Sequence, residues 1–433
     1  MELNVCLLND SFPPVIDGVS NAVTNYASII QNLYGKSTVV TPNYPDTTDN
    51  YPFSVIRYPS INTTKVLRYR TGNPFNTKII NSLEQQNFDI LHSHCPFASG
   101  ILARTLRERI NAPHILTYHT KFDIEIATAL SSESLQNIAM KLLTNNISVA
   151  DEIWVVSEGA AQSLRNLGYQ GETILMENGV DLPKEKVSPE RIEALKSELA
   201  LPDGVPVFLF IGRLQWYKNI RITLDALSAL KKLGRDFRFL IVGDGSDKEE
   251  MQSYVKELEL QENCRFFGSI QDRERLRDFF SLSDLFLFPS TYDTNGLVVR
   301  EAAACQLASV IVEKSGAAEG IVDGQNGLLI EENAPSMAQK LIWACDHLDT
   351  IHRIGVAAQN EIYISWNEAV EKAYHRYEYL YDKMQRGLLP RKEARGDSMF
   401  ELVAEWSAAS AKLRSMPRSM IDKTNSIYEK FKK

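Results

Sequence analysis

Residues 285–304 read Leu-Phe-Leu-Phe-Pro-Ser-Thr-Tyr-Asp-Thr-Asn-Gly-Leu-Val-Val-Arg-Glu-Ala-Ala-Ala. The four apolar residues 285–288 predict a short buried strand, and Pro289 ends it. A polar turn follows, and the segment that begins at Gly296 predicts a helix. A strand, a loop and a helix in this order form one unit of a parallel sheet, so the stretch indicates an α/β fold.

The start of this predicted helix is also a candidate binding site. Thr294 or Asn295 can cap the helix with a side-chain oxygen, and the exposed amides of its first turn suit a phosphate. Asp293 precedes the helix and Glu301 lies inside it, so two carboxylates flank the anion site. This arrangement suits a sugar nucleotide. An ordinary strand, loop and helix with two solvated acids fits the spacing equally well.

The same stretch resembles the Glu-x7-Glu region of the family 4 glycosyltransferases, which are retaining enzymes with the two-domain GT-B fold. The resemblance implies that Asp293 contacts the hexose of a nucleotide-sugar donor and that Glu301 binds the ribose. This chain has Asp293 where the family usually has the longer Glu. The resemblance also implies donor contacts at the helix start, which holds Asn295, Gly296, Leu297 and Val298.

A second candidate site lies at residues 210–219, which read Phe-Ile-Gly-Arg-Leu-Gln-Trp-Tyr-Lys-Asn. Arg213 and Lys218 are cations at the carboxyl end of a predicted parallel strand, where ligands bind in open α/β sheets. On their own, two such cations are more often solvated surface residues. The stretch also resembles the family's Gly-Arg-Leu-x(n)-Lys signature, which implies that Arg213 and Lys218 hold the donor diphosphate and take part in catalysis.

These residues predict a reaction that needs no metal and no cofactor besides the nucleotide-sugar substrate. Negative charge develops on the nucleoside diphosphate as the glycosidic bond breaks, and fixed cations and helix-terminal amides can stabilise it. The sequence shows no convincing Asp-x-Asp motif for a divalent ion. His92, His94 and Cys95 are close in sequence, but no further metal ligand is evident near them.

Three further positions take expected roles from the resemblance. Gly18 lies in the first strand-to-helix loop, where a residue without Cβ lets the backbone approach a phosphate, although a plain turn glycine is as good an explanation. His119 follows the predicted strand 114–118. A lone histidine there is more often structural, but the family's matching histidine faces the reacting sugar. His119 is therefore the N-terminal catalytic candidate, as a transition-state stabiliser. The resemblance also implies that Ile270 lies near the nucleobase.

Predicted strands and helices alternate along most of the chain, which indicates parallel sheets covered on both faces. The predicted strands of the first series are 3–8, 37–41, 90–92, 114–118 and 152–156. Those of the second series are 207–211, 238–242, 264–267, 285–288, 309–312 and 327–330. The fold class is α/β, and the resemblance implies GT-B, in which two Rossmann-like domains face across a cleft and a C-terminal helix crosses back.

The domain boundaries follow from turn residues and from this resemblance. We expect an acceptor-side domain at 1–183 and a nucleotide-sugar domain at 184–365, because Asn-Gly at 178–179 and the following Pro183 suit a linker. Residues 366–384 carry apolar side chains at helical spacing. They match the family's crossover helix, and a terminal helix on its own domain is the alternative.

Residues 385–433 extend beyond the resemblance and contain eleven Lys and Arg against six Asp and Glu. The segments 399–413 and 420–431 predict amphipathic helices. Basic residues beside apolar and aromatic ones suit an anionic membrane surface. A helical appendage packed on the protein or on a second subunit, as in a homodimer, is the alternative.

Composition sets further limits. The chain has 433 residues, which is too long for one core and suits two domains. A net charge of −8 gives no global basic field for nucleic acid. Its five cysteines are scattered and odd in number, which predicts reduced core residues of a cytoplasmic protein. No signal-peptide pattern and no long apolar run is present, so we expect no membrane-spanning helix.

The sequence therefore predicts a cytoplasmic retaining hexosyltransferase, peripheral at the inner membrane face if its extension binds lipid. It would use a UDP-sugar and glycosylate a hydroxyl of a lipid or carbohydrate. A GT-B epimerase of sugar nucleotides is one alternative, although it should carry more acid/base carboxylates. A protein that binds a nucleotide sugar without turnover is the other, because Asp293 replaces the usual Glu.

Overall fold

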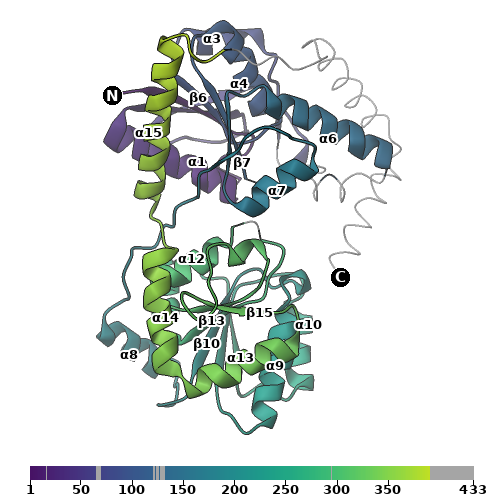
Figure 1. The fold of residues 1–433 in the computed structure, drawn as a ribbon, viewed down its shortest axis with the longest axis vertical. Helices are drawn as coiled ribbons and strands as arrows, with labels where there is room; N and C mark the ends of the chain where they lie inside the picture. Colours follow the sequence, from purple (N-terminus) through teal and green to yellow (C-terminus); the bar gives the residue numbers. More distant parts are fainter. Residues whose placement is uncertain are drawn as a thin grey trace. The chain divides into compact units, whose positions relative to one another are not determined.

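The computed structural model describes residues 1–15, 17–64, 70–119, 122, 126, 132–293 and 295–390, which form two compact units (Figure 1). Unit 1 comprises residues 1–178 with helix α15 (Trp366–Gln385), and unit 2 comprises residues 179–365. The chain passes from unit 1 to unit 2 between Asn178 and Gly179. The amphipathic helices expected at 399–413 and 420–431 lie outside the described residues.

Unit 1 is built on a parallel sheet of seven strands in the order β3-β2-β1-β6-β7-β8-β9. The strands are β1 (Asn4–Leu8), β2 (Lys36–Pro42), β3 (Ser54–Tyr58), β6 (Ile90–Ser93), β7 (His114–Tyr118), β8 (Glu152–Val155) and β9 (Ile174–Leu175). An antiparallel pair is formed by β4 (Ser60–Ile61) and β5 (Thr71–Gly72). The helices are α1 (Gly18–Ile29), η1 (Ile30–Tyr34), α3 (Thr77–Glu84), α4 (Ala98–Arg109), α6 (Glu133–Ser148) and α7 (Glu158–Asn166).

Unit 2 is built on a parallel sheet of six strands in the order β12-β11-β10-β13-β14-β15. The strands are β10 (Val207–Ile211), β11 (Arg238–Val242), β12 (Cys264–Gly268), β13 (Leu285–Phe288), β14 (Ser309–Val312) and β15 (Leu328–Ile330). The helices are α8 (Pro189–Glu198), η2 (Trp216–Lys218), α9 (Ile220–Lys232), α10 (Lys248–Glu257), α11 (Arg273–Leu282), α12 (Leu297–Ala304), η3 (Gly316–Ala318), α13 (Ala334–Asp346) and α14 (Leu348–Glu361).

The two sheets share one strand order, which confirms the predicted α/β class with two Rossmann-like units. Numbered within its own unit, each sheet runs 3-2-1-4-5-6, and unit 1 adds a seventh strand at one edge. The order therefore reverses between β1 and β6 in unit 1, and between β10 and β13 in unit 2. Ligands of such sheets bind beside this switch point, at the carboxyl ends of the strands.

Helix α15 follows unit 2 in the chain but packs on unit 1, beside α1 (Figure 1). Tyr377 is fully buried and stacks on Trp154, with ring centroids 5.3 Å apart. The Tyr374 hydroxyl accepts a hydrogen bond from Leu3 N at 2.8 Å. Apolar residues at helical spacing thus bury one face of α15 against the first sheet, as expected for the crossover helix of a GT-B fold.

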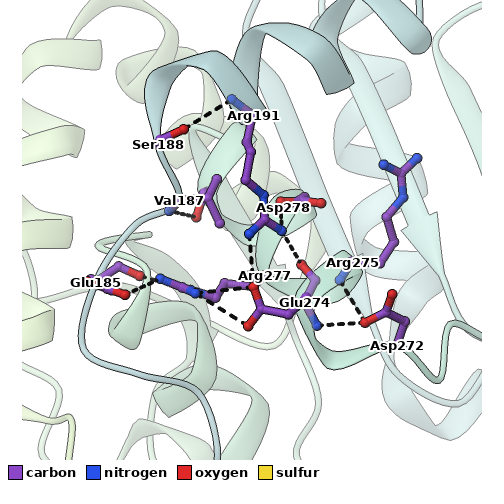
Figure 2. A network of polar contacts seen from close by, with 10 residues as sticks. Glu185, Val187, Ser188, Arg191, Asp272, Glu274, Arg275, Arg277 and Asp278 are labelled. Atoms are coloured by element: carbon purple, nitrogen blue, oxygen red, sulfur yellow. Dashed lines mark hydrogen bonds and ion pairs between the residues drawn. The ribbon is translucent and has the colours of Figure 1, made fainter.

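A network of ion pairs fixes the start of unit 2 to its own core (Figure 2). Arg277 on α11 is buried and pairs with Glu185 at 2.7 Å, ahead of α8. Arg191 on α8 reaches Glu274 at 2.9 Å and Asp278 at 2.5 Å, both on α11. The segment that follows the crossing at Asn178 is therefore held to unit 2 by charged contacts.

Candidate functional site

Two loops beside the switch point of unit 2 bring together residues that lie far apart in the sequence. The loop after β10 carries Arg213 and Lys218, and the loop after β13 carries Asp293 and Asn295. The two strands are parallel neighbours in the sheet, so both loops start from one edge. The structure therefore places the two sequence motifs of this half at a single site.

Lys218 and Asp293 form a bidentate ion pair. The Lys218 ammonium lies 2.7 and 2.8 Å from the two carboxylate oxygens of Asp293. Lys218 is only 8% exposed, and its ammonium lies 5.6 Å from the ring centre of Tyr217 and 5.8 Å from that of Tyr292. Arg213, by contrast, is exposed. Lys218 is thus a partly desolvated cation that already holds a carboxylate.

The N-terminus of α12 is built differently from the prediction. Its N-cap is Gly296, in the left-handed conformation with φ 55°, and no described side chain caps the helix. A Cβ at Gly296 would lie 2.7 Å from the Cβ of Ala317, so the close approach of that loop also requires glycine. The expected cap by Asn295 is wrong because the helix starts one residue later. The alternative cap, Thr294, lies outside the described residues.

Asn295 is buried at this helix start, and its side chain has no partner among the described residues. It is 4% exposed, and neither its Oδ1 nor its Nδ2 makes a hydrogen bond to a described residue. Its backbone carbonyl accepts from Arg300 Nη1 at 2.6 Å, which holds the turn. Buried polar atoms are normally satisfied, so an unpartnered amide beside uncapped helical N–H groups points to a ligand that supplies the partners.

Glu301 lies in the second turn of α12 and pairs with an arginine that the sequence analysis missed. Arg273 Nη2 is 2.6 Å from Glu301 Oε1 and 3.9 Å from Asp181. Burial raises the pKa of the Glu301 carboxyl, and the neighbouring Arg273 partly offsets this shift. Arg273 is the first residue of α11, directly after the β12 loop that contains Ile270. The structure therefore places the predicted nucleobase loop beside the predicted ribose acid.

Two glycines after β11 support this site without a ligand role of their own. Gly243 has φ 143°, and a Cβ there would collide with the Gly212 carbonyl. A Cβ at Gly245 would collide with the Leu214 carbonyl. Leu214 N also donates to the Asp244 carbonyl at 3.0 Å. The turn therefore packs directly against the Arg213 loop and fixes its path.

In unit 1, Gly18 is the first residue of α1, and a carboxylate caps this helix. Asp17 Oδ1 accepts from Val19 N at 2.9 Å and from Ser20 N at 2.7 Å. Ser20 Oγ accepts in return from Asp17 N at 2.9 Å. A Cβ at Gly18 would meet nothing within 4 Å. Packing within the described chain therefore does not explain why this position is glycine.

His119 follows β7 and lies among buried, uncharged histidines. His119 Nε2 is 3.0 Å from His94 Nδ1, and the two rings are stacked. Burial lowers the pKa of His119 to about 3, so its imidazole is neutral near pH 7. Both ring nitrogens of His92 contact hydroxyls, Tyr377 at 2.5 Å and Thr117 at 2.6 Å. The buried histidines of this unit are thus hydrogen-bonded to each other and to hydroxyls.

The sequence matches two glycosyltransferase families over most of its length. Residues 16–184 match the family described as Glycosyltransferase Family 4. Residues 191–361 match the family described as Glycosyl transferases group 1. The two matches fall on unit 1 and unit 2, respectively.

Named relatives and solved structures agree with these matches. The chain is 24% identical over 343 residues to an alpha-monoglucosyldiacylglycerol synthase of Acholeplasma laidlawii, covering 76% of this chain and 85% of the relative. It is 26% identical over 334 residues to a GDP-mannose-dependent alpha-mannosyltransferase of Mycobacterium tuberculosis, covering 76% and 84%. The crystal structure of Anabaena Alr3699/HepE in complex with UDP superposes with a TM-score of 0.71 at 18% identity, covering 88% of this chain and 100% of that one.

Proposed function

Since this chain belongs to the family 4 glycosyltransferases of the GT-B fold, we propose that it transfers a hexose from a UDP-sugar to a hydroxyl acceptor with retention of configuration. The observation that carries the proposal is that unit 2 holds a buried cation, Lys218, at the same site as a helix N-terminus that no described side chain caps. Lys218 and the uncapped N–H groups of α12 are the groups that a diphosphate needs. Arg213 adds a second, exposed cation on the same loop as Lys218.

Each part of the donor has a proposed partner in unit 2. The diphosphate binds Arg213, Lys218 and the backbone from Gly296 to Val298, and the buried Asn295 amide gains its missing partners there. Glu301 accepts from the ribose hydroxyls, and the base lies along the loop at Ile270. His119 and Gly18 supply the contacts from unit 1. His119 would stabilise the reacting sugar, and Gly18 would admit a phosphate to the backbone.

The Lys218–Asp293 pair suggests how the donor enters. The Asp293 carboxylate occupies the cation that the diphosphate would use. A diphosphate carries more negative charge than one carboxylate and can displace it from Lys218. Asp293 would then be free to accept a hydrogen bond from a hexose hydroxyl. The shorter acid of this chain thus keeps a role at the sugar, and it first acts as the internal partner of Lys218.

The same groups supply the electrostatic catalysis. As the glycosidic bond breaks, the leaving UDP gains negative charge, and Lys218, Arg213 and the α12 amides stabilise it in place of a divalent metal. Such groups are fixed before the reaction, so they need little reorganisation when the charge develops. The proposal therefore needs no covalent nucleophile and no cofactor besides the donor.

The nucleotide and the acceptor are the less constrained parts of the proposal. UDP is supported by the Anabaena complex, whereas the mycobacterial relative is named for GDP-mannose. A lipid acceptor is supported by the name of the Acholeplasma relative. None of the described helices is both long and apolar enough to span a bilayer. We propose separately that a lipid acceptor is met at a membrane surface and that the basic extension, residues 385–433, binds this surface.

The test is incubation with UDP-glucose, UDP-galactose and GDP-mannose, each with and without membrane-lipid and carbohydrate acceptors, read by mass spectrometry. We expect free UDP and a glycosylated lipid only when donor and acceptor are both present. A new sugar epimer without an acceptor would instead support an epimerase. Binding of the donor without formation of any product would support the alternative of a nucleotide-sugar-binding protein without turnover.

Co-sedimentation with anionic vesicles tests the membrane part separately. The full chain should bind vesicles at low salt, and a version that ends at Pro390 should bind them less. This shortened chain keeps α15 whole. Equal recovery of both proteins in the supernatant would remove the extension as a membrane contact.

A further inference from the structure

The hydrogen bond between His94 and His119 has a direction that the surrounding residues determine. His94 follows β6, and His119 follows β7, its neighbour in the sheet. His94 Nδ1 and His119 Nε2 are 3.0 Å apart, and the ring planes differ by 23°. A neutral imidazole has one N–H and one bare nitrogen, so one of the two rings donates and the other accepts.

The other nitrogen of His94 decides which ring donates. His94 Nε2 is buried and has no partner among the described residues. If His94 accepted at Nδ1, its proton would sit on Nε2 as a buried N–H without an acceptor. If His94 donates from Nδ1, Nε2 is only a bare lone pair. Orphaned buried N–H groups are rarer in proteins than under-satisfied acceptors, so the second arrangement is favoured.

The ring of His94 is also held in place by its neighbours. The His92 ring lies 4.0 Å from it, and the Tyr26 ring meets it in an edge-to-face pair at 5.4 Å, both measured between centroids. His92 is fixed in turn by Tyr377 and Thr117. Burial lowers the pKa of His94 and of His119, which keeps both rings neutral. His94 therefore presents one fixed nitrogen to His119.

We propose that His94 is a positioning residue that holds His119 as the neutral tautomer with its proton on Nδ1. His119 Nε2 is used as the acceptor, so Nδ1–H is left as a donor, and it bonds to no described residue. His119 then offers a sugar oxygen a hydrogen bond and cannot remove a proton through that nitrogen. This role at a sugar rests on the proposed function, whereas the tautomer does not.

The opposite arrangement has one physical argument in its favour. If the edge of the His94 ring meets the face of Tyr26, an N–H on His94 Nε2 would gain a weak N–H···π contact. His94 would then accept from His119, and His119 would present a bare Nδ1, which can act as a base. The two arrangements differ in which nitrogen of each ring carries the proton, and this difference is directly measurable.

Nitrogen-15 NMR of the full chain with labelled histidine rings tests the tautomer without any substrate. We expect protonated Nδ1 and bare Nε2 for both His94 and His119 at pH 7.5. The variants His94→Asn and His119→Asn assign the two sets of signals. A His119 ring with its proton on Nε2, or a doubly protonated ring, would overturn the proposal, whatever activity the protein has.

Kinetics of matched variants then test the positioning role. His94→Asn keeps an amide donor near the place of Nδ1, and His94→Leu removes it. We expect kcat to fall about tenfold in His94→Leu, the equivalent of one hydrogen bond, with an unchanged donor KM and substantial recovery in His94→Asn. His114→Leu is the control, because His114 is equally buried but bonds to Ser93 and not to His119. An unchanged kcat in a folded His94→Leu protein would overturn the role.

If no donor supports transfer, the proposed function fails, and the NMR result still decides the tautomer. If transfer occurs and the tautomer is the expected one, the loss in His94→Leu relative to His114→Leu measures what the positioning contributes.

Discussion

Units 1 and 2 have the same strand order but differ at one helix start beside each switch point. In unit 1, the carboxylate of Asp17 accepts hydrogen bonds from the first backbone amides of α1. In unit 2, α12 starts at a left-handed glycine and no described side chain caps it. The buried side-chain amide of Asn295 beside it has no partner in the part of the chain that the structure describes. Unit 1 thus supplies its own anion at the helix that follows its first strand, β1, and unit 2 leaves open the helix that follows its fourth strand, β13. The strand order sets where a ligand can bind, and the residue before the helix sets whether an anion is favoured.

The units also differ in their titratable groups. Unit 1 buries four histidines, at positions 92, 94, 114 and 119, whereas the histidines of unit 2, at 347 and 352, are exposed. Unit 1 also buries an acid, Asp10, and desolvation raises the pKa of its carboxyl to about 6. Unit 2 instead has a cation and a carboxylate in direct contact at its candidate site. The candidate residues of unit 1 therefore lie among neutral imidazole rings, whereas the candidate site of unit 2 contains opposite charges in contact.

Lowering the pH should destabilise unit 1 before unit 2, and this loss of folding stability is the largest effect that we expect. Burial lowers the pKa of all four histidines, to about 3 for His114 and His119, so the unfolded chain binds more protons below pH 6.5. Stability is then lost as pH falls, by about 1.4 kcal/mol per pH unit for each histidine. Asp10 offsets the loss of stability from one histidine. Its pKa is raised in the folded protein, so the folded state binds a proton at a higher pH than the unfolded chain does.

Hydrogen exchange read by mass spectrometry at pH 7.5 and pH 5.5 checks this prediction. Protection should fall in the strands of unit 1 and persist in those of unit 2. There the partly buried Glu301 has a raised pKa, so its titration does not favour unfolding as the pH falls. An equal loss of protection in both units would contradict the proposed origin in the histidines.

Loss of a donor-site cation is the next largest effect. Lys218→Ala and Arg213→Ala should lower kcat by about 10²–10³, because each removes a fixed charge from the leaving diphosphate. Lys340→Ala is a matched control, since Lys340 also forms a bidentate pair, with Asp323 at 2.7 Å, in the same unit. Near-normal turnover in both site variants would exclude this mechanism.

Asp293→Asn should separate sugar transfer from nucleotide binding. We expect transfer to fall by about 10², while UDP affinity stays the same or rises by up to about tenfold, because Lys218 no longer holds a competing carboxylate. Calorimetry with UDP at low salt measures the affinity, with Asp323→Asn as the control. Equal losses of transfer and of UDP affinity would mean that Asp293 has a structural role.

Glu301→Ala should weaken nucleotide binding about tenfold, the equivalent of one or two hydrogen bonds. The decisive comparison uses UDP and 2′-deoxy-UDP. The native protein should prefer UDP, and the variant should bind both equally, since the acceptor for the ribose hydroxyl is gone. A variant that keeps the preference would place the ribose elsewhere. Arg273→Ala shows how much of the loss comes from leaving Arg273 without its carboxylate.

Gly18→Ala should have the smallest effect. Nothing lies within 4 Å of the added methyl group, and alanine favours a helix, so stability should be kept or rise by up to about 1 kcal/mol. If a phosphate approaches this backbone, kcat should still fall about fivefold, the equivalent of ~1 kcal/mol. Unchanged kinetics with unchanged melting would identify Gly18 as a plain turn residue.

Most strands were predictable because a covered parallel sheet needs continuous apolar runs. The predicted strands 114–118, 207–211, 238–242, 285–288 and 309–312 have the bounds of β7, β10, β11, β13 and β14. The short pair β4 and β5 was missed, and so were β3 and β9 of the first large sheet. β3 contains Ser54 and Arg57, and β9 has only two residues, so neither shows such a run. All five cysteines are free thiols and four are buried, as predicted.

The site was less predictable wherever a feature depends on a distant segment. Arg213, Lys218, Asp293 and Glu301 could be chosen from two local motifs, but the contact of Lys218 with Asp293 depends on β10 lying beside β13. The helix start depends on Gly296 packing against Ala317. The partnership of Glu301 with Arg273 joins two helices. The Asp17–Ser20 capping box is local in the sequence and was predictable, but it was not predicted.

The return of α15 to unit 1 determines the order in which the chain can fold during synthesis. Residues 1–178 leave the ribosome first, yet the surface around β1 and Trp154 stays uncovered until Tyr374 and Tyr377 have been made. Unit 2 is one continuous segment and can close as soon as it emerges. The half that is translated second can therefore be completed first, and the N-terminal half keeps an uncovered apolar surface until α15 has been made.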